Sequence, residues 1–213
     1  MKYAFFNPLI MGIDKMPDDT FEKIKKLAEK LHERVDLNDA GNEDLSVRGG
    51  QQIQVLPNDA TINVDWLVDF LEDYLTQYIQ QVKTQSMLPD MDFVNVKVTS
   101  IWTIKQSPGE YQAMHNHPAG HISGNMYIET PVLAEGSTKI DNNILFKFPV
   151  EKDVTKFILQ DGWCYRPEEK DILIFPSYLS HLVYPWQGTG NRTVMAFDAV
   201  LLPKVPDGPK TSN

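Results

Sequence analysis

The stretch that decides the fold follows Pro89 and reads VNVKVTSIWTI, residues 94–104. Its side chains alternate in character: Val94, Val96, Val98, Trp102 and Ile104 are apolar, and Asn95, Lys97, Thr99 and Thr103 are polar. A period of two is that of a β-strand with one face buried. The stretch therefore predicts a long, half-buried strand and a fold built on β-sheet.

Further short segments with strand character follow, separated by turn sequences such as Ser107-Pro108-Gly109 and Gly188-Thr189-Gly190-Asn191. They are 111–117, 124–130, 143–148, 156–159, 171–175, 181–185 and 192–201. Short strands at such spacing favour a sandwich or barrel, and a double-sheet jelly roll has eight strands. The remainder, 203–213, contains Pro206, Gly208 and Pro209 and is expected to be a flexible tail.

The residues before this region have a helical period instead. Apolar side chains recur at helical spacing from Phe21 to Val35 and again from Val64 to Val82. Between them, 36–61 is polar, contains Gly41 and Gly49-Gly50, and is expected to be a long loop. The fold class predicted is mainly β with N-terminal helices (α+β). The expected organisation is one domain over 1–213, with a helical cover and loop at 1–90 and a jelly-roll core at 91–202.

Composition narrows the possible partners. The 213 residues include 20 Lys+Arg and 29 Asp+Glu, and the net charge of −9 disfavours nucleic acid and anionic membrane surfaces. A single cysteine, Cys164, excludes an internal disulfide and favours a reducing compartment, so a cytoplasmic location is expected. No apolar run is long enough to span a bilayer, and the apolar stretch after Met1 is too short for a signal peptide.

Histidines carry the functional signal. Three of the five lie in His115-Asn116-His117-Pro118-Ala119-Gly120-His121. On a strand, His115 and His117 project from the same face, and two imidazoles directed at one point form half of a metal site. The remote candidate for a third ligand is His181. We expect His121 to lie beyond the strand at the cavity mouth and His32 to be a solvated residue of the first helix.

A set of residues between Ile101 and Asp198 recurs in a known family. They are Trp102, Gly109, His115-x-His117-Pro118, Ser123-Gly124-x-x-Tyr127, Phe175-Pro176-Ser177, His181, Pro185 and Arg192 through Asp198. In order and spacing this segment resembles the putative 2-oxoglutarate/Fe(II)-dependent oxygenases, in particular a branch common in phage and marine bacterial genomes. The N-terminal half resembles them only in layout, with helices preceding the barrel.

The resemblance implies a double-stranded β-helix (jelly roll), flanked by the two helices, with Fe(II) held at its open end by His115, His117 and His181. It also implies 2-oxoglutarate as cosubstrate, with its distal carboxylate on Arg192 and Tyr127 as a second donor. A planar guanidinium grips a carboxylate with two charge-assisted bonds, which lysine cannot do. The implied activity is hydroxylation of a peptide side chain or a small metabolite, with decarboxylation of 2-oxoglutarate to succinate.

The middle ligand departs from the usual pattern. Most of the superfamily binds iron with His-x-Asp/Glu…His, whereas this sequence has His117, as the branch often does. Three neutral imidazoles leave the full +2 charge on the metal, which favours the dianionic cosubstrate. Imidazole also suits Zn and Cu, so the identity of the metal stays open.

Two other interpretations remain open. Gly109, His115-x-His117 and Pro176 before His181 partly match the cupin motifs, but the expected glutamate is missing and a cupin would not need Arg192. The chain could also be a non-catalytic jelly-roll or virion-associated module, whose structural metal would be closed by a fourth protein ligand. The prime substrate and the oligomeric state stay open as well.

Two further residues carry expectations of a structural kind. Asp198 shares the strand parity of Arg192, so it is expected to point inward or to lie at the far end of the barrel, and a buried carboxylate there would need partners. Cys164, between Trp163 and Tyr165, is expected to be a small buried hydrophobe.

Overall fold

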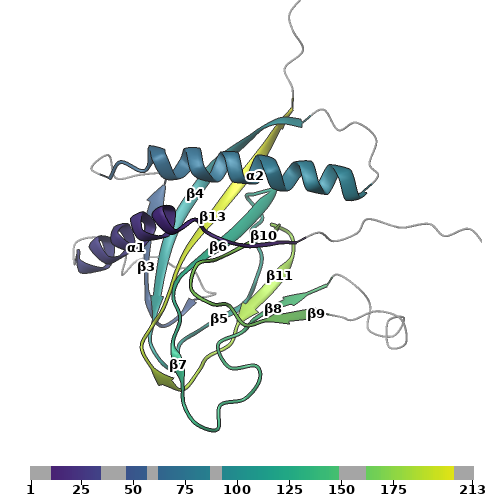
Figure 1. The fold of residues 1–213 in the computed structure, drawn as a ribbon. Coiled ribbons are helices and arrows are strands. Elements are labelled where there is room, and N and C mark those ends of the chain that lie inside the picture. The colour runs from purple at the N-terminus through teal and green to yellow at the C-terminus, as the bar shows by residue number, and fades with distance from the viewer. Residues whose placement is uncertain (1–10, 35–46, 57–61, 87–92, 149–161, 204–213) are drawn as a thin grey trace, which may run out of the picture.

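The computed structural model describes residues 11–34, 47–56, 62–86, 93–148 and 162–203. Within them, two helices cover one face of a six-stranded sheet, and a five-stranded sheet lies against its other face (Figure 1). The order of layers is thus helices, large sheet, small sheet.

Both helices predicted from apolar spacing are present. α1 spans Asp18–Glu33 and α2 spans Asp65–Ser86. On α1, Phe21, Ile24, Ala28 and Leu31 are buried, with the same spacing that the sequence shows. Asp18 and Asp19 lie in the first turn, where negative charge is favoured by the helix dipole. The helices therefore form because their apolar stripes have a sheet to cover.

The large sheet is antiparallel throughout. Its strands, in spatial order, are β1 (Gly12–Lys15), β10 (Asp171–Pro176), β6 (Ile122–Glu129), β13 (Arg192–Pro203), β4 (Phe93–Gln106) and β3 (Gln51–Leu56). The strand expected at 94–104 is β4, which pairs along its length with β13 (Figure 1).

The small sheet is also antiparallel. Its strands, in order, are β2 (Val47–Arg48), β5 (Tyr111–His115), β11 (Ser180–Val183), β8 (Ile144–Lys147) and β9 (Gly162–Tyr165). A separate two-stranded ribbon consists of β7 (Val132–Leu133) and β12 (Gly188–Thr189). The strand expected at 156–159 lies outside the described residues.

The long loop expected at 36–61 is wrong for its described part, because residues 47–56 form β2 and β3. β3 alternates buried Ile53 and Val55 with glutamines and pairs with the edge of β4. Because these glutamines make the segment look polar, its two-residue period does not by itself predict a strand. Pairing with β4 is what makes it one. With β1, this means that the N-terminal region supplies strands as well as helices to the fold.

The alternation in β4 was expected to separate one buried face from one exposed face, but the apolar residues lie on both faces of the strand. The register between β4 and β13 shifts between Asp198 and Ala199, as at a β-bulge. Val96 and Val98 pack under the helices, whereas Trp102 and Ile104 face the small sheet. Thr103, expected on a wet face, is completely buried. The strand is therefore buried on both faces near its end.

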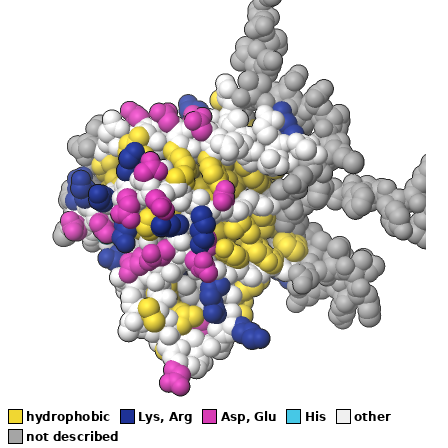
Figure 2. Space-filling view, viewed as in Figure 1, with side chains coloured by type: hydrophobic (Ala, Val, Ile, Leu, Met, Phe, Trp, Pro, Cys, Tyr) yellow, Lys and Arg dark blue, Asp and Glu magenta, His cyan; other side chains and the backbone are white. Residues whose placement is uncertain are grey.

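Charged side chains of both signs are intermixed on the helix-bearing side of the molecule (Figure 2). Lys15 of β1 pairs with the buried Asp171 at 2.6 Å and with Glu168 at 3.0 Å, and Lys170 pairs with Asp18 at 2.7 Å. These contacts join the N-terminal elements to the turn before β10. Neither described helix has the length and apolar character needed to cross a lipid bilayer.

Candidate functional site

Three histidines meet between the two sheets. His115 on β5 and His181 on β11 are directly paired across the small sheet. His117 lies two residues beyond the end of β5, where its backbone N–H donates to the Ser177 carbonyl at 2.9 Å. One ring nitrogen from each histidine lies within 4.8 Å of the others. The three side chains are thus close enough to share one divalent ion.

Hydrogen bonds fix how the rings present their nitrogens. Nδ1 of His115 donates to the Ala113 carbonyl at 2.7 Å, and Nδ1 of His181 donates to the Leu179 carbonyl at 2.9 Å. With the proton on Nδ1, the lone pair of a neutral imidazole is on Nε2. Both histidines are therefore held in the tautomer that binds a metal through Nε2.

His117 is held in the same way, but by a carboxylate. Its Nδ1 lies 3.1 Å from Oδ1 and 3.3 Å from Oδ2 of Asp198. Its Nε2 is buried and has no hydrogen-bond partner among the described residues. A buried nitrogen without a partner is costly, and a metal ion at the centre of the three rings would satisfy it. The donor set therefore fits a divalent metal.

Asp198 is anchored behind His117. The Ser123 hydroxyl donates to Asp198 Oδ1 at 2.6 Å, and Ser123 Oγ lies 2.8 Å from Ser177 Oγ. The inward carboxylate inferred from strand parity thus has partners, as a buried charge requires. The site therefore contains a carboxylate, but Asp198 contacts the ring of His117 and does not itself lie at the position of a metal ligand.

Burial sets the protonation of the innermost histidine. Burial, together with a smaller contribution from the neighbouring His115, lowers the pKa of His181 to about 3. His181 is therefore a neutral imidazole near pH 7, which is the form that coordinates metals.

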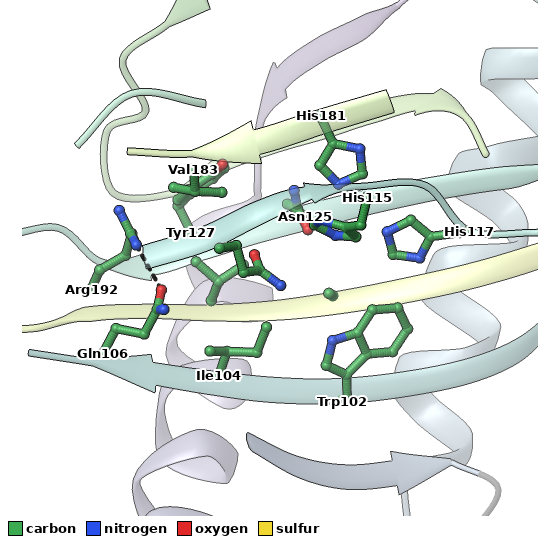
Figure 3. A pocket seen from close by; sticks show the side chains of 13 residues that line it. Trp102, Ile104, Gln106, His115, His117, Asn125, Tyr127, His181, Val183 and Arg192 are labelled. Atoms are coloured by element: carbon green, nitrogen blue, oxygen red, sulfur yellow. Dashed lines mark hydrogen bonds between the residues drawn. The ribbon is translucent and has the colours of Figure 1, made fainter. Parts of the chain in front are cut away.

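The histidines form one end of a cavity between the sheets. Its volume is about 400 Å³, counted with the part open to solvent. Arg192, Gln106 and Tyr127 lie at the end away from the three imidazoles, and Trp102, Ile104 and Val183 line the walls (Figure 3). A ligand in this cavity would have nitrogen lone pairs at one end and hydrogen-bond donors at the other.

Arg192 is the buried cation of the second end. Only 2% of its surface is exposed, and its guanidinium lies 4.6 Å from the centre of the Trp186 ring. Burial lowers its pKa to about 10, so it still carries its charge near pH 7. Burial raises the pKa of Tyr127, which therefore stays a protonated hydroxyl. Both of these predicted residues thus line the cavity as donors.

Three other predicted residues lie outside the cavity. His121 is exposed, and its Nδ1 accepts the backbone N–H of Leu201 at 2.9 Å. The expectation of a solvated His32 is wrong: its ring is half-buried between Gln51 Oε1, at 2.8 Å, and Thr103 Oγ1, at 3.0 Å. The expectation of a buried Cys164 is also wrong, because it is exposed on the edge strand β9.

Three residues at the site were not predicted from the sequence: Gln106 and Asn125, which line the cavity, and Asn142, which bonds Arg192 from outside that lining. Gln106 continues the inward parity of Trp102 and Ile104, and Asn125 precedes Tyr127 by two, so strand alternation could have found both. Asn142, which bonds Arg192, is a loop residue with a φ of 60°, and its sequence carries no such signal.

Two facing antiparallel sheets, three convergent imidazoles and a buried arginine in one cavity define a class of protein that can hold a divalent metal beside an anionic ligand. Residues 100–198, which include every one of these side chains, match the sequence model of the family described as putative 2OG-Fe(II) oxygenase. Over this segment, which is just under half of the chain, the protein is similar to a family named for Fe(II) and 2-oxoglutarate.

Solved structures share the fold. A Pseudomonas putida prolyl-4-hydroxylase is 17% identical, with a TM-score of 0.56 over 88% of this chain and 91% of its own. The viral collagen prolyl hydroxylase of Paramecium Bursaria Chlorella virus-1, as its 2OG complex, is 12% identical, with a TM-score of 0.53 over 89% and 94%. HygX from Streptomyces hygroscopicus, with nickel, 2-oxoglutarate and hygromycin B bound, is 12% identical, with a TM-score of 0.55 over 90% and 82%. No curated protein matches the sequence.

Proposed function

We propose that the protein is a non-haem dioxygenase that hydroxylates a C–H bond of a peptide side chain or a small metabolite. In this proposal His115, His117 and His181 hold Fe(II), and Arg192 and Tyr127 bind the distal carboxylate of 2-oxoglutarate. The observation that carries it is the sharing of one cavity by the three imidazoles and the buried arginine. A cupin-type metalloenzyme would have no use for that arginine.

The imidazole end is built to hold a metal and leave part of its coordination open. Three protein ligands on one side are typical of catalytic sites, whereas structural sites are closed by four. When bound, iron and 2-oxoglutarate supply the oxidising chemistry, in which dioxygen hydroxylates the substrate while 2-oxoglutarate loses carbon dioxide and becomes succinate. The neutral ligands leave the metal at +2, and Asp198 supplies partial compensation through His117.

The arginine end orients the cosubstrate. The guanidinium can give a carboxylate two parallel charge-assisted bonds, and the protonated Tyr127 adds a neutral donor. Between the two ends, Ile104, Val183 and Val194 are apolar walls that exclude water from the reacting centre. The protein thus orients the cosubstrate, supplies a positive charge for its carboxylate and excludes water from the cavity.

The fold proposed for this chemistry is a double-stranded β-helix formed by the two facing sheets. We also propose that 1–213 fold as one domain, because β1 and β3, from the first ninety residues, belong to the same sheet as β4 and β13. Support for the two substrate classes comes from the names of the structural neighbours, which include prolyl hydroxylases and a protein crystallised with hygromycin B.

The test is an anaerobic titration of Fe(II)-loaded protein with 2-oxoglutarate, followed by exposure to oxygen. We expect a metal-to-ligand charge-transfer band on titration and succinate after oxygen is admitted. The variant His181→Ala should lose the band through loss of the metal. Wild-type protein that holds Fe(II) but gives neither band nor succinate would contradict the proposal and favour the non-catalytic module.

A further inference from the structure

Arg192 is held by neutral hydrogen-bond acceptors, and the charge of Glu110 acts on it from beyond ion-pair distance. Its Nη1 donates to Asn142 Oδ1 at 3.1 Å and to the Tyr184 carbonyl at 2.9 Å, and its Nη2 donates to the Glu110 carbonyl at 3.5 Å. Within the described residues, no carboxylate lies at ion-pair distance from the guanidinium. The nearby Glu110 carboxylate instead accepts the Ser107 backbone N–H at 2.6 Å. The arginine therefore has hydrogen-bond partners and a buried positive charge that no ion pair within the described residues neutralises.

Gln106 occupies the position where an ion-pair partner would be expected. It is the direct cross-strand neighbour of Arg192, and its side chain is 3% exposed. Its Oε1 accepts from both Nη2, at 2.7 Å, and Nε, at 3.2 Å (Figure 3). A single neutral oxygen thus accepts from both nitrogens on this edge of the guanidinium, the edge that a carboxylate would bind with two oxygens.

The other atom of the same amide is unsatisfied. Because a guanidinium can only donate, the oxygen of Gln106 must face it, and the orientation of the amide is fixed. Nε2 is consequently directed away from Arg192, and it is buried without a hydrogen-bond partner among the described residues. Gln106 lines the cavity that holds the histidines. A buried N–H donor without a partner, beside a buried cation that has no ion pair within the described residues, forms a site that suits an anion.

We infer that Gln106 is a third binding residue for the distal carboxylate of 2-oxoglutarate, and that its neutrality keeps Arg192 available for that carboxylate. The inference rests on the proposed function. Oε1 holds the guanidinium in position, and Nε2 donates to the incoming carboxylate next to the arginine. A glutamate here would retain the first role and abolish the second, because its own charge would neutralise Arg192 and repel the ligand.

The experiment measures ligand affinity rather than turnover. Mn(II)-loaded protein is titrated anaerobically by calorimetry with 2-oxoglutarate and with 2-oxopentanoate, which keeps the chelating end and lacks the distal carboxylate. The variants are Gln106→Glu and Gln106→Leu, with Gln77→Glu as a control that adds the same charge at an exposed position of α2. Mn(II) affinity and thermal stability are recorded for each.

We expect Gln106→Glu to weaken the binding of 2-oxoglutarate by about 100-fold, because it adds a repelling charge, and Gln106→Leu by about 10-fold, because it removes one hydrogen bond to the carboxylate. Both should bind Mn(II) and 2-oxopentanoate as the wild type does, and Gln106→Glu should be at least as heat-stable, since it gains an ion pair. Gln77→Glu should behave as wild type throughout.

Two results would overturn the inference while leaving the proposed function intact. One is unchanged affinity of both Gln106 variants for 2-oxoglutarate. The other is an equal loss for both ligands, which would indicate a structural role for Gln106. Wild-type protein that binds Mn(II) but not 2-oxoglutarate would remove the proposed function, and the inference with it.

Discussion

The two faces of the six-stranded sheet show how stability and function are divided in this protein. The face under the helices is apolar and sealed: Val96, Val98, Ile101, Met195 and Phe197 pack there against residues of α1 and α2. The opposite face carries polar and charged groups, namely the buried Gln106, Tyr127, Arg192 and Asp198 and the partly buried Asn125. One face of the sheet thus stabilises the folded state, and the other carries the side chains that are proposed to bind ligands.

The two faces contribute differently to the free energy of folding. A fully buried apolar side chain contributes about 1.5–3 kcal/mol to stability. Burial of these polar groups opposes folding. The Nε2 atoms of Gln106 and His117 are buried without a hydrogen-bond partner among the described residues, and the charge of Arg192 is buried without an ion pair there. The cavity face is therefore stabilised by the helical face, and substitutions on the two faces should separate ligand affinity from stability.

The largest effect is expected at the charged end of the cavity. Arg192→Met removes two charge-assisted bonds to 2-oxoglutarate, each worth about 1.5–3 kcal/mol. Affinity for 2-oxoglutarate should fall by about 100-fold or more, while Mn(II) affinity stays the same. Anaerobic calorimetry measures both. A parallel loss of Mn(II) binding would mean that the two ends of the cavity are not separate sites.

The second effect belongs to the helical face. Leu71 is completely buried on α2, and Leu71→Ala should lower the free energy of unfolding by about 2–5 kcal/mol through lost contacts and a cavity. Urea denaturation gives the value. Mn(II) and 2-oxoglutarate affinities of the folded variant should match the wild type, and a clear fall in either would break the division between the faces.

A smaller effect is expected behind the imidazoles. Asp198→Asn removes the charge that accepts from His117 Nδ1, and partners of this kind are worth about 10–100-fold in metal affinity. Metal affinity by competition with a chelator should fall in that range, with stability little changed. Ser100→Ala is the control, because Ser100 lies directly opposite Asp198 on β4 but its hydroxyl bonds Gln54 and Leu56 of β3. Unchanged metal affinity in Asp198→Asn would show that the carboxylate does not orient His117.

The smallest effect concerns His32, between α1 and the sheet. Burial lowers the pKa of His32 in the folded protein. Below the unfolded pKa of about 6.5, the unfolded chain therefore binds a proton that the folded chain does not, and stability falls as the pH falls. His32→Gln should lose stability less steeply between pH 7.5 and 5.5, as measured by urea denaturation. An identical pH slope would show that His32 titrates alike in both states.

The sequence predicted this arrangement unevenly, for physical reasons. His115-x-His117 and the helical stripes follow from local periodicity, so these elements could be placed without tertiary information. The strand β3 could not be predicted in this way, because Gln51–Leu56 is mostly polar and forms a strand through its pairing with β4. The change of face between Val98 and Trp102 depends on a register shift set by β13, which no local pattern records.

The candidate site divides in the same way. His181 follows from the histidine pattern as the remote candidate for a third ligand, whereas Arg192 and Tyr127 come from the resemblance to a family. Gln106 was missed although its parity was visible, because a polar residue continuing an apolar alternation is ordinarily assigned to solvent. Cys164 and His32 were misplaced because exposure is decided by which edge or layer an element occupies, and that is a tertiary property.

The most direct test of the central claim is a crystal structure of the protein with Mn(II) and 2-oxoglutarate bound under nitrogen. The account predicts one metal ion bound by Nε2 of His115, His117 and His181, chelated by the 2-oxo end of the ligand, with the distal carboxylate on Arg192. A metal closed by a fourth protein ligand, or a 2-oxoglutarate whose distal carboxylate lies away from Arg192, would contradict it.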